Sequence, residues 1–374
     1  MITTIITIVV FFIILSILVF VHELGHYTVA RLIGVHVEEF GFGLPPRIWG
    51  KKIGKTIYSI NWLPIGGFVK LSGEDDDPPS AKASAGKGSS KQTLSQYFWA
   101  RSKTERVAIL LAGVTMNFLL AVGITTYLLT QGVYETTGQV HIERVVAGSP
   151  AAAAGIKQND IITRVTYSPL GVSGETKSVI VPSDLVTFTH AHEGESITFT
   201  IVRNSSTFPV SLVPRKTFPA GEGPMGVAVS DLEFKTYPLS RAPWVAVKQN
   251  VARAGDMFTG IWGLIVKVAQ LKPVGADVAG PIGIAQVTGQ AVKFGFRAVL
   301  EFMSLLSLNL AVLNVLPIPA LDGGRVLFVF LEKILGRKIA PAFERSTHQI
   351  GMLILLALVV LISIHDILRL AQGG

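Results

Sequence analysis

Two histidines and a glutamate near the start of the chain have the spacing of a metal-binding helix. His22 and His26 are four residues apart in the stretch VHELGH, so on an α-helix both imidazoles project from one face, one turn apart. Glu23 lies beside them and can reach a metal-bound water instead of the metal. In this pattern two neutral imidazoles bind Zn²⁺, and the carboxylate takes a proton from the bound water.

The motif is short, and short motifs also arise by chance. Its position gives it more weight, because the preceding segment from Ile2 to Val21 contains no charged residue. Histidine and glutamate inside an apolar segment of membrane length are costly, and such residues usually have a function and a partner nearby. The chain contains no cysteine, so further zinc ligands must come from His, Asp or Glu.

Catalytic zinc needs a third protein ligand and an open position for water. Asp322 is the strongest candidate, because it follows a long apolar segment in the stretch NVLPIPALDGGR. Pro317 and Pro319 should end the helix there and free backbone carbonyls. The alternative is that Asp322 only caps the next helix, a position that aspartate favours. The presence of the histidine pair on another apolar segment favours the ligand role.

The composition is that of a membrane protein with one sizeable soluble part. Hydrophobic residues make up 49% of the 374 positions, charged residues only 16%, and the mean hydropathy is +0.50. The net charge of +8 could indicate a nucleic-acid partner. We expect none, because the basic residues cluster beside apolar segments, which is typical of charges that determine membrane orientation. Four segments reach the roughly 20 apolar residues that a bilayer requires: Ile2–Ile33, Val107–Thr130, Phe302–Leu321 and Ser346–His365.

The distribution of lysine and arginine predicts how these segments are oriented. Both residue types are concentrated between the first and second segments and between the third and fourth, so both connections should be cytoplasmic. The central part of the chain and both termini should then lie outside. The first segment lacks a basic n-region and is too long for a signal peptide, which predicts a retained span. His22 precedes Arg31 by nine residues, roughly 13 Å from the inner end of the span.

Between the first two spans, Lys55–Leu71 is rich in β-forming residues around the sequence Pro-Ile-Gly-Gly. This pattern predicts a β-hairpin. Residues 72–92 are small, polar and low in complexity, which predicts a loop. The three aspartates at 75–77 lack the spaced ligands of a calcium loop, so we interpret them as part of a solvated linker.

A compact α+β domain is predicted outside the membrane, over residues 134–216. Ala147–Val165 has the pattern of a turn, a short helix and a strand, and residues 195–215 that of two strands joined at Asn-Ser-Ser. This order resembles a bacterial, circularly permuted PDZ domain, although Gln-Asn-Asp stands at 158–160 where that family usually has Pro-Gly-Asp. Further on, Leu239–Leu271 predicts an amphipathic helix on the outer membrane surface, in contact with lipid.

These features divide the chain into four predicted regions. Residues 1–133 contain two spans, the HExxH motif and the hairpin, and residues 134–216 form the PDZ-like domain. Residues 217–296 contain the surface helix and the stretch GPIGIAQ, and residues 297–374 contain two spans and the stretch NVLPIPALDGG. Together these motifs resemble the site-2 protease family of intramembrane zinc metalloproteases, in its bacterial RseP-type branch, here with a single PDZ domain. The expected fold is a polytopic α-helical membrane protein of about four transmembrane helices. It would carry a membrane-associated β-hairpin and an inserted extracytoplasmic PDZ-like α+β domain.

The resemblance implies a role for each motif residue. His22, His26 and Asp322 would be the zinc ligands, and Glu23 the general base. Asn314 would hold the backbone of an extended substrate, with an interhelical hydrogen bond as the alternative. The other residues that would bind substrate are Pro317 and Pro319, and, by strand addition to the hairpin, Ile57, Ser59, Asn61, Gly66 and Gly67.

The implied function is hydrolysis of peptide bonds within or near the membrane spans of single-pass proteins, in the bacterial cytoplasmic membrane. Substrates of the family include anti-sigma factors and remnant signal peptides, which another protease would already have trimmed. The zinc site would lie near the cytoplasmic side. Two other classes stay open: a membrane scaffold with an inactive motif, against which the intact Glu23 and Asp322 argue, and a metal transporter, against which the single ligand cluster argues.

Overall fold

The computed structural model describes residues 2–74, 95–169, 174–270, 280–337 and 339–371. It divides into two compact units, one made of residues 1–128 and 238–374 and the other of residues 129–237. The three aspartates at 75–77 and most of the predicted loop lie outside the described residues.

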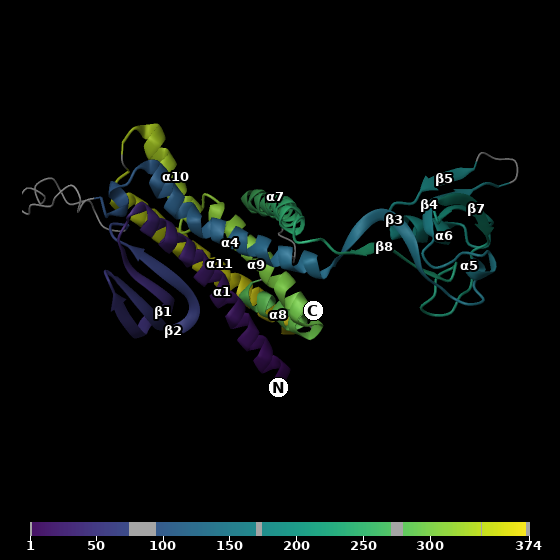
Figure 1. The fold of residues 1–374 in the computed structure, drawn as a ribbon, viewed down its shortest axis with the longest axis horizontal. Helices are drawn as coiled ribbons and strands as arrows, with labels where there is room; N and C mark the ends of the chain where they lie inside the picture. Colours follow the sequence, from purple (N-terminus) through teal and green to yellow (C-terminus); the bar gives the residue numbers. More distant parts are fainter. Residues whose placement is uncertain (1, 75–94, 170–173, 271–279, 338, 372–374) are drawn as a thin grey trace, which may run out of the picture. The chain divides into compact units, whose positions relative to one another are not determined.

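Four long helices form the frame of the first unit: α1 (Ile2–Ile33), α4 (Lys103–Gln131), α9 (Phe296–Val315) and α11 (Pro341–Ala371). They follow roughly one direction in Figure 1. Among the described residues, these four helices are long and apolar enough to cross a membrane. Large apolar side chains stay exposed on them, such as Leu353, which is 70% exposed. Such surfaces are stable in lipid, and the four helices correspond to the four predicted segments.

The third span has the predicted length of 20 residues but lies six residues earlier in the chain than the apolar segment Phe302–Leu321. Helix α9 ends at Val315, just before the two prolines that were predicted to end it. Pro317 and Pro319 cause this end, since a proline cannot donate the helical hydrogen bond and its ring clashes with the preceding turn. A new helix, α10 (Asp322–Leu335), starts at the candidate ligand.

Two further helices of the first unit are α7 (Ala242–Ala269) and α8 (Pro281–Phe294). Trp244, Val251, Phe258 and Trp262 of α7 are exposed, and their spacing of seven, seven and four residues places them on one face of the helix. The buried carboxylate of Asp366 on α11 accepts the backbone N–H groups of Gly280 and Gly283, at 3.1 and 2.8 Å, and so caps the start of α8.

The strands β1 (Val37–Ile53) and β2 (Thr56–Leu71) pair with each other over more residues than the predicted hairpin contains. The chain reverses at Gly54, which has a φ of +64°, and again at the predicted Pro-Ile-Gly-Gly, where Gly66 has a φ of +90°. The two halves of the predicted hairpin do not pair with each other, because residues 37–44 lie between them. Residues 37–44 pair both with 67–71 and with 57–63, and residues 47–53 pair with 56–61. The long strands therefore act as four short ones, with residues 67–71 at one edge and 47–53 at the other.

The second unit contains an antiparallel sheet of six strands in the order β7-β6-β4-β3-β8, with β5 paired to β4. The strands are β3 (Val133–Val145), β4 (Ile161–Tyr167), β5 (Glu175–Ser178), β6 (Ile197–Arg203), β7 (Ser206–Leu212) and β8 (Val227–Lys235). Two helices accompany them, α5 (Pro150–Ala153) and α6 (Pro182–Ala191). Strand β8 lies beyond residue 216, the predicted end of this domain.

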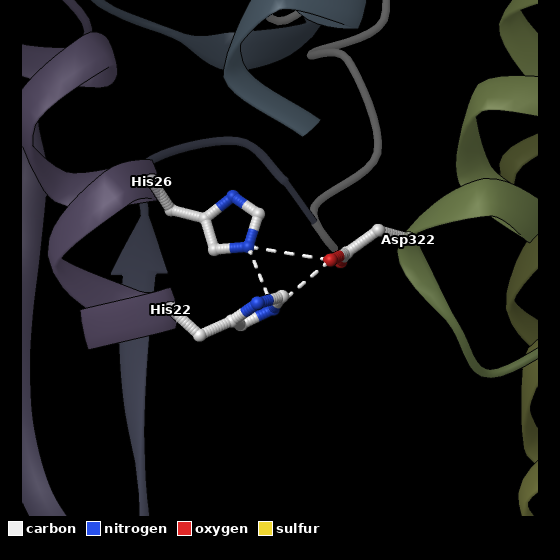
Figure 2. Close-up of side chains that lie close together, drawn as sticks. All are labelled: His22, His26 and Asp322. Carbon is white, nitrogen blue, oxygen red and sulfur yellow. Dashed lines mark hydrogen bonds and ion pairs between the residues drawn. The ribbon is translucent and has the colours of Figure 1, made fainter. Parts of the chain in front are cut away.

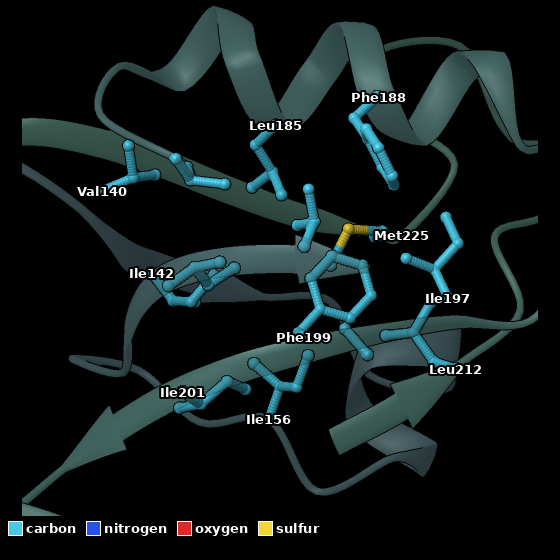
Figure 3. Close-up of a cluster of buried hydrophobic side chains, with 14 residues drawn as sticks. Val140, Ile142, Ile156, Leu185, Phe188, Ile197, Phe199, Ile201, Leu212 and Met225 are labelled. Carbon is cyan, nitrogen blue, oxygen red and sulfur yellow. The ribbon is translucent and has the colours of Figure 1, made fainter. Parts of the chain in front are cut away.

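This second unit has its own hydrophobic core, shown in Figure 3. Alternate residues of β6, Ile197, Phe199 and Ile201, are completely buried, as expected for a strand with one face inside. Leu185 and Phe188 of α6 point into the same cluster. The unit therefore has what an independently folding domain needs.

Candidate active site

Three side chains from distant parts of the sequence converge in the first unit (Figure 2). The Nε2 atoms of His22 and His26 are 3.2 Å apart. The Oδ2 atom of Asp322 lies 3.0 Å from the first and 3.4 Å from the second. Tetrahedral zinc, with bonds of about 2.1 Å, separates its ligand atoms by about 3.4 Å. Both the spacing and the donor set, two imidazoles and a carboxylate, therefore fit zinc.

The sequence explains how each ligand reaches this point. His22 and His26 occupy successive turns of α1, while Asp322 is the first residue of α10. The carboxylate of Asp322 faces Nε2 of both histidines, the atoms that would share a metal with it. A carboxylate binds a metal in its ionised form.

Helix α4 orients both imidazoles. The Nδ1–H of His26 donates to the backbone carbonyl of Ile109 at 2.8 Å, which leaves the Nε2 lone pair for a metal. The Nδ1 atom of His22 lies 3.4 Å from the carboxamide of Asn117, whose side chain is completely buried. The atom of the carboxamide at this distance is the nitrogen Nδ2, while the oxygen is buried and has no hydrogen-bond partner among the described residues. When His22 binds metal through Nε2, its Nδ1 carries the proton, and the carboxamide accepts that proton once it is turned to present its oxygen.

Two glycines allow α1 and α4 to approach this closely. A Cβ on Gly113 of α4 would overlap Nε2 of His26 and lie 2.7 Å from Cε1 of His22. A Cβ on Gly25 of α1 would lie 2.8 Å from the side chain of Met116. Neither Gly113 nor Asn117 was recognised from the sequence as part of the site. Their separation of four residues on one span was the available signal, because it places them on one face of the helix.

The candidate base, Glu23, faces the edge of the β-sheet. Its carboxylate accepts the backbone N–H of Val69. A Cβ on Gly67 would lie 3.4 Å from Cγ of Glu23 and 3.0 Å from the carbonyl oxygen of Gly41. The glycine thus lets the strand that contains residues 67–71 pass directly beside the candidate base.

The other predicted hairpin residues are placed differently. Ile57 pairs with Glu39 on one side and with Lys52 on the other, and Ser59 is likewise paired on both sides. The Asn61 amide donates to the carbonyls of Phe42 and Gly43. These residues are in the interior of the sheet and present no free backbone edge. In the described part of the chain, residues 67–71 pair with β1 on one side only, which makes this stretch the available edge beside Glu23.

The remaining predicted residues surround the turn before Asp322. Asn314 is partly buried on the last turn of α9, and its contact with substrate stays a prediction. Pro319 packs against Gly351 of α11. The two glycines after Asp322 let the first turn of α10 approach the backbone of residues 315–319, because side chains there would overlap carbonyl oxygens of that segment.

A cavity of about 970 Å³ includes the ligand cluster and Glu23. The strand of residues 68–71 lines one part of it, and the charged side chains of Arg325, Glu332 and Arg345 line another. Charged walls keep water in a cavity. The candidate site therefore combines a metal-binding triad, a carboxylate base, an adjacent strand edge and space for water, which together suit hydrolysis of an extended peptide.

Comparison with known proteins agrees with this arrangement. The model of the family described as peptidase family M50 matches residues 10–358. A Clostridium perfringens protein that is provisionally named a zinc metalloprotease is 30% identical over 354 residues, or 94% of this chain and 96% of the relative. The zinc metalloprotease RasP of Geobacillus kaustophilus is 28% identical over 439 residues, or 98% of this chain and 99% of the relative.

Proposed function

The chain belongs to peptidase family M50, the site-2 protease family of zinc metalloproteases, and from this we propose that it cleaves membrane-spanning substrates within the bilayer. The proposal rests on the position of the metal-binding residues. Two of the three ligands, and Glu23, lie on α1, a helix apolar enough to cross a membrane. A peptide bond must therefore reach that depth to be hydrolysed, which points to peptide bonds within or near the spans of single-pass membrane proteins.

The chemistry uses groups already in place. Zinc bound by His22, His26 and Asp322 supplies a Lewis acid and lowers the pKa of a bound water. Glu23 accepts a proton from the attacking water and delivers it to the leaving amide nitrogen. The backbone N–H of Val69 holds the Glu23 carboxylate in position for both transfers.

A substrate helix must unwind before its backbone can enter this site, because its carbonyls are bonded within the helix. The edge formed by residues 67–71 can accept the unwound segment as an additional strand, through the backbone groups other than the Val69 N–H that Glu23 accepts. Because this edge runs beside Glu23, strand addition brings the scissile bond to the base. Asn314, Pro317 and Pro319 complete the proposed substrate site.

The location and the partners are part of the same proposal. The protein would lie in the bacterial cytoplasmic membrane with both termini outside and the zinc site near the cytoplasmic side, as the distribution of basic residues favours. The unit Leu129–Tyr237 would be a PDZ-like domain outside, which admits substrates that another protease has trimmed, such as anti-sigma factors or remnant signal peptides. The apolar face of α7 would lie on the lipid surface.

Glu23→Gln tests the proposal. Wild type and variant are co-expressed with a panel of tagged single-pass membrane proteins, and Glu301→Gln, an exposed change on α9, is the control. We expect the variant to retain zinc, to bind substrate and to leave it intact, while wild type and control cleave it. Cleavage by the variant at the wild-type rate would refute the role of Glu23. A zinc-free wild type would favour a scaffold, and zinc without any peptide cleavage would favour a transporter.

A further inference from the structure

The turn that leads into Asp322 contains a backbone conformation that its sequence does not favour. Ala320, two residues before the ligand, has a φ of +80°. A residue with a Cβ is uncommon in this left-handed region, because the Cβ crowds the backbone. Such conformations persist only where surrounding contacts enforce them. Contacts that hold Ala320 in this conformation therefore also determine the position of Asp322, where helix α10 begins.

Helix α11 supplies these contacts. The backbone N–H of Ala320 donates to Nδ1 of His348 at 2.9 Å. One turn further along the helix, Gly351 faces the preceding residue, and a Cβ there would lie 2.7 Å from the carbonyl oxygen of Pro319. The imidazole of His348 also packs against the ring of Phe328 on α10, with centroids 5.5 Å apart. The turn is thus held between a hydrogen bond and a close backbone contact from the same helix.

We propose that His348 is a positioning residue for the metal site: its Nδ1 atom keeps Ala320 in the left-handed conformation and thereby holds the carboxylate of Asp322 at the two histidines. The inference rests on the proposed zinc site, and it assigns to α11 the role of holding the turn before Asp322. Of the ligand cluster found in the described residues, no member lies on α11. Helix α11, the fourth span, therefore contributes to metal binding indirectly, by holding the backbone turn at Ala320.

Zinc affinity of the purified full-length chain, measured by competition with a chelating indicator, tests this directly. His348→Leu removes the acceptor, and we expect affinity to fall roughly tenfold, at the lower end of the range for residues that orient metal ligands. His348→Asn places an amide oxygen where Nδ1 was, and should stay within about threefold of wild type. Thr347→Val, which loses only a bond to the carbonyl of Phe343 on its own helix, should leave affinity unchanged.

The same substitution in a second variant, Ala320→Gly, distinguishes a positioning role of His348 from a general effect on protein stability. Ala320→Gly gives the turn a residue that adopts positive φ freely, so His348→Leu should lower zinc affinity by clearly less than tenfold in that background. This non-additivity is what coupling through the turn requires. Equal losses in both backgrounds, or wild-type zinc affinity of His348→Leu, would overturn the inference.

Should His348→Leu fail to fold, Gly351→Ala provides an independent test. Its methyl group pushes on Pro319 from the same helix, and it should weaken zinc binding while His348 is intact; unchanged affinity would count against the inference. A wild-type chain that binds no zinc is a different result, because it would contradict the metal site itself.

Discussion

The carboxamide of Asn117 and the Nδ1 atom of His22 are 3.4 Å apart in the buried contact between α4 and α1. The nearer atom of the carboxamide is its nitrogen, and a turn of the amide group brings its buried, unpartnered oxygen toward the imidazole N–H. The backbone carbonyl of Asn117 in turn accepts the hydroxyl of Ser307 on α9, at 2.8 Å. One residue thus connects a metal ligand to two neighbouring helices.

We expect Asn117→Leu to lower zinc affinity and peptidase activity by roughly 10- to 100-fold, the usual effect of losing a partner that orients a metal-binding histidine. Asn117→Asp keeps an acceptor and should retain most of the affinity. Zinc titration of both purified variants provides the measurement. Equal affinities for the leucine variant and wild type would show that His22 does not depend on this contact.

Gly113 should tolerate no side chain. Gly113→Ala places a methyl group against both imidazoles, and overpacking of this kind typically costs about 1–3 kcal/mol. We expect loss of zinc binding and a lower melting temperature. Gly123→Ala on the same helix is the matched control, since nothing lies within 4 Å of a Cβ there; it should be neutral or slightly stabilising. Similar behaviour of the two variants would argue against the tight helix contact at the site.

The substrate edge can be located by disulfide cross-linking, because the chain has no native cysteine. Lys70→Cys on the edge beside the site and Lys51→Cys on the opposite edge are each combined with Glu23→Gln. Each is then expressed with a substrate that carries one cysteine near its cleavage site. We expect cross-links at position 70 and few at position 51. The reverse preference would move substrate binding to the far edge of the sheet.

Asp160 should make the second unit sensitive to acid. Its side chain is fully buried, and Arg203 donates two hydrogen bonds of 2.6 Å to it. Burial alone would raise the pKa of Asp160, but Arg203 and the Lys157 N–H hold it below the ordinary value. A lowered folded pKa gives stability that is present above the unfolded value of about 3.9 and is lost as pH falls through the folded pKa.

The measurement is thermal unfolding of residues 129–237, which contain a complete core. Asp160→Asn should cost about 1–3 kcal/mol at pH 7, the range for hydrogen bonds to charged groups. Below pH 4 the difference from wild type should shrink, because wild type then loses the same charge. An unchanged difference across this range would mean that the pair does not cause the acid sensitivity.

Much of the site was accessible from the sequence because its signals are local. That His22 and His26 share one helix face follows from the helical repeat alone. The four long apolar segments likewise predict four membrane-length helices, whatever the packing between them. Asp322 was identified by its place after two prolines, and the structure brings it to the histidines. These features could be predicted from the sequence because each of them depends on only a few neighbouring residues.

The tertiary structure decided what depends on distant neighbours. Gly113 and Asn117 matter because α4 packs against the motif helix, and Ile57 and Ser59 are interior because residues 37–53 pair beside them. No pattern within Lys55–Leu71 shows which of its backbone groups already have partners. The same holds for the turn at Ala320, whose conformation depends on a histidine from another helix. The sequence by itself determined which residues could bind zinc, and packing determined what holds them and where a substrate strand can lie.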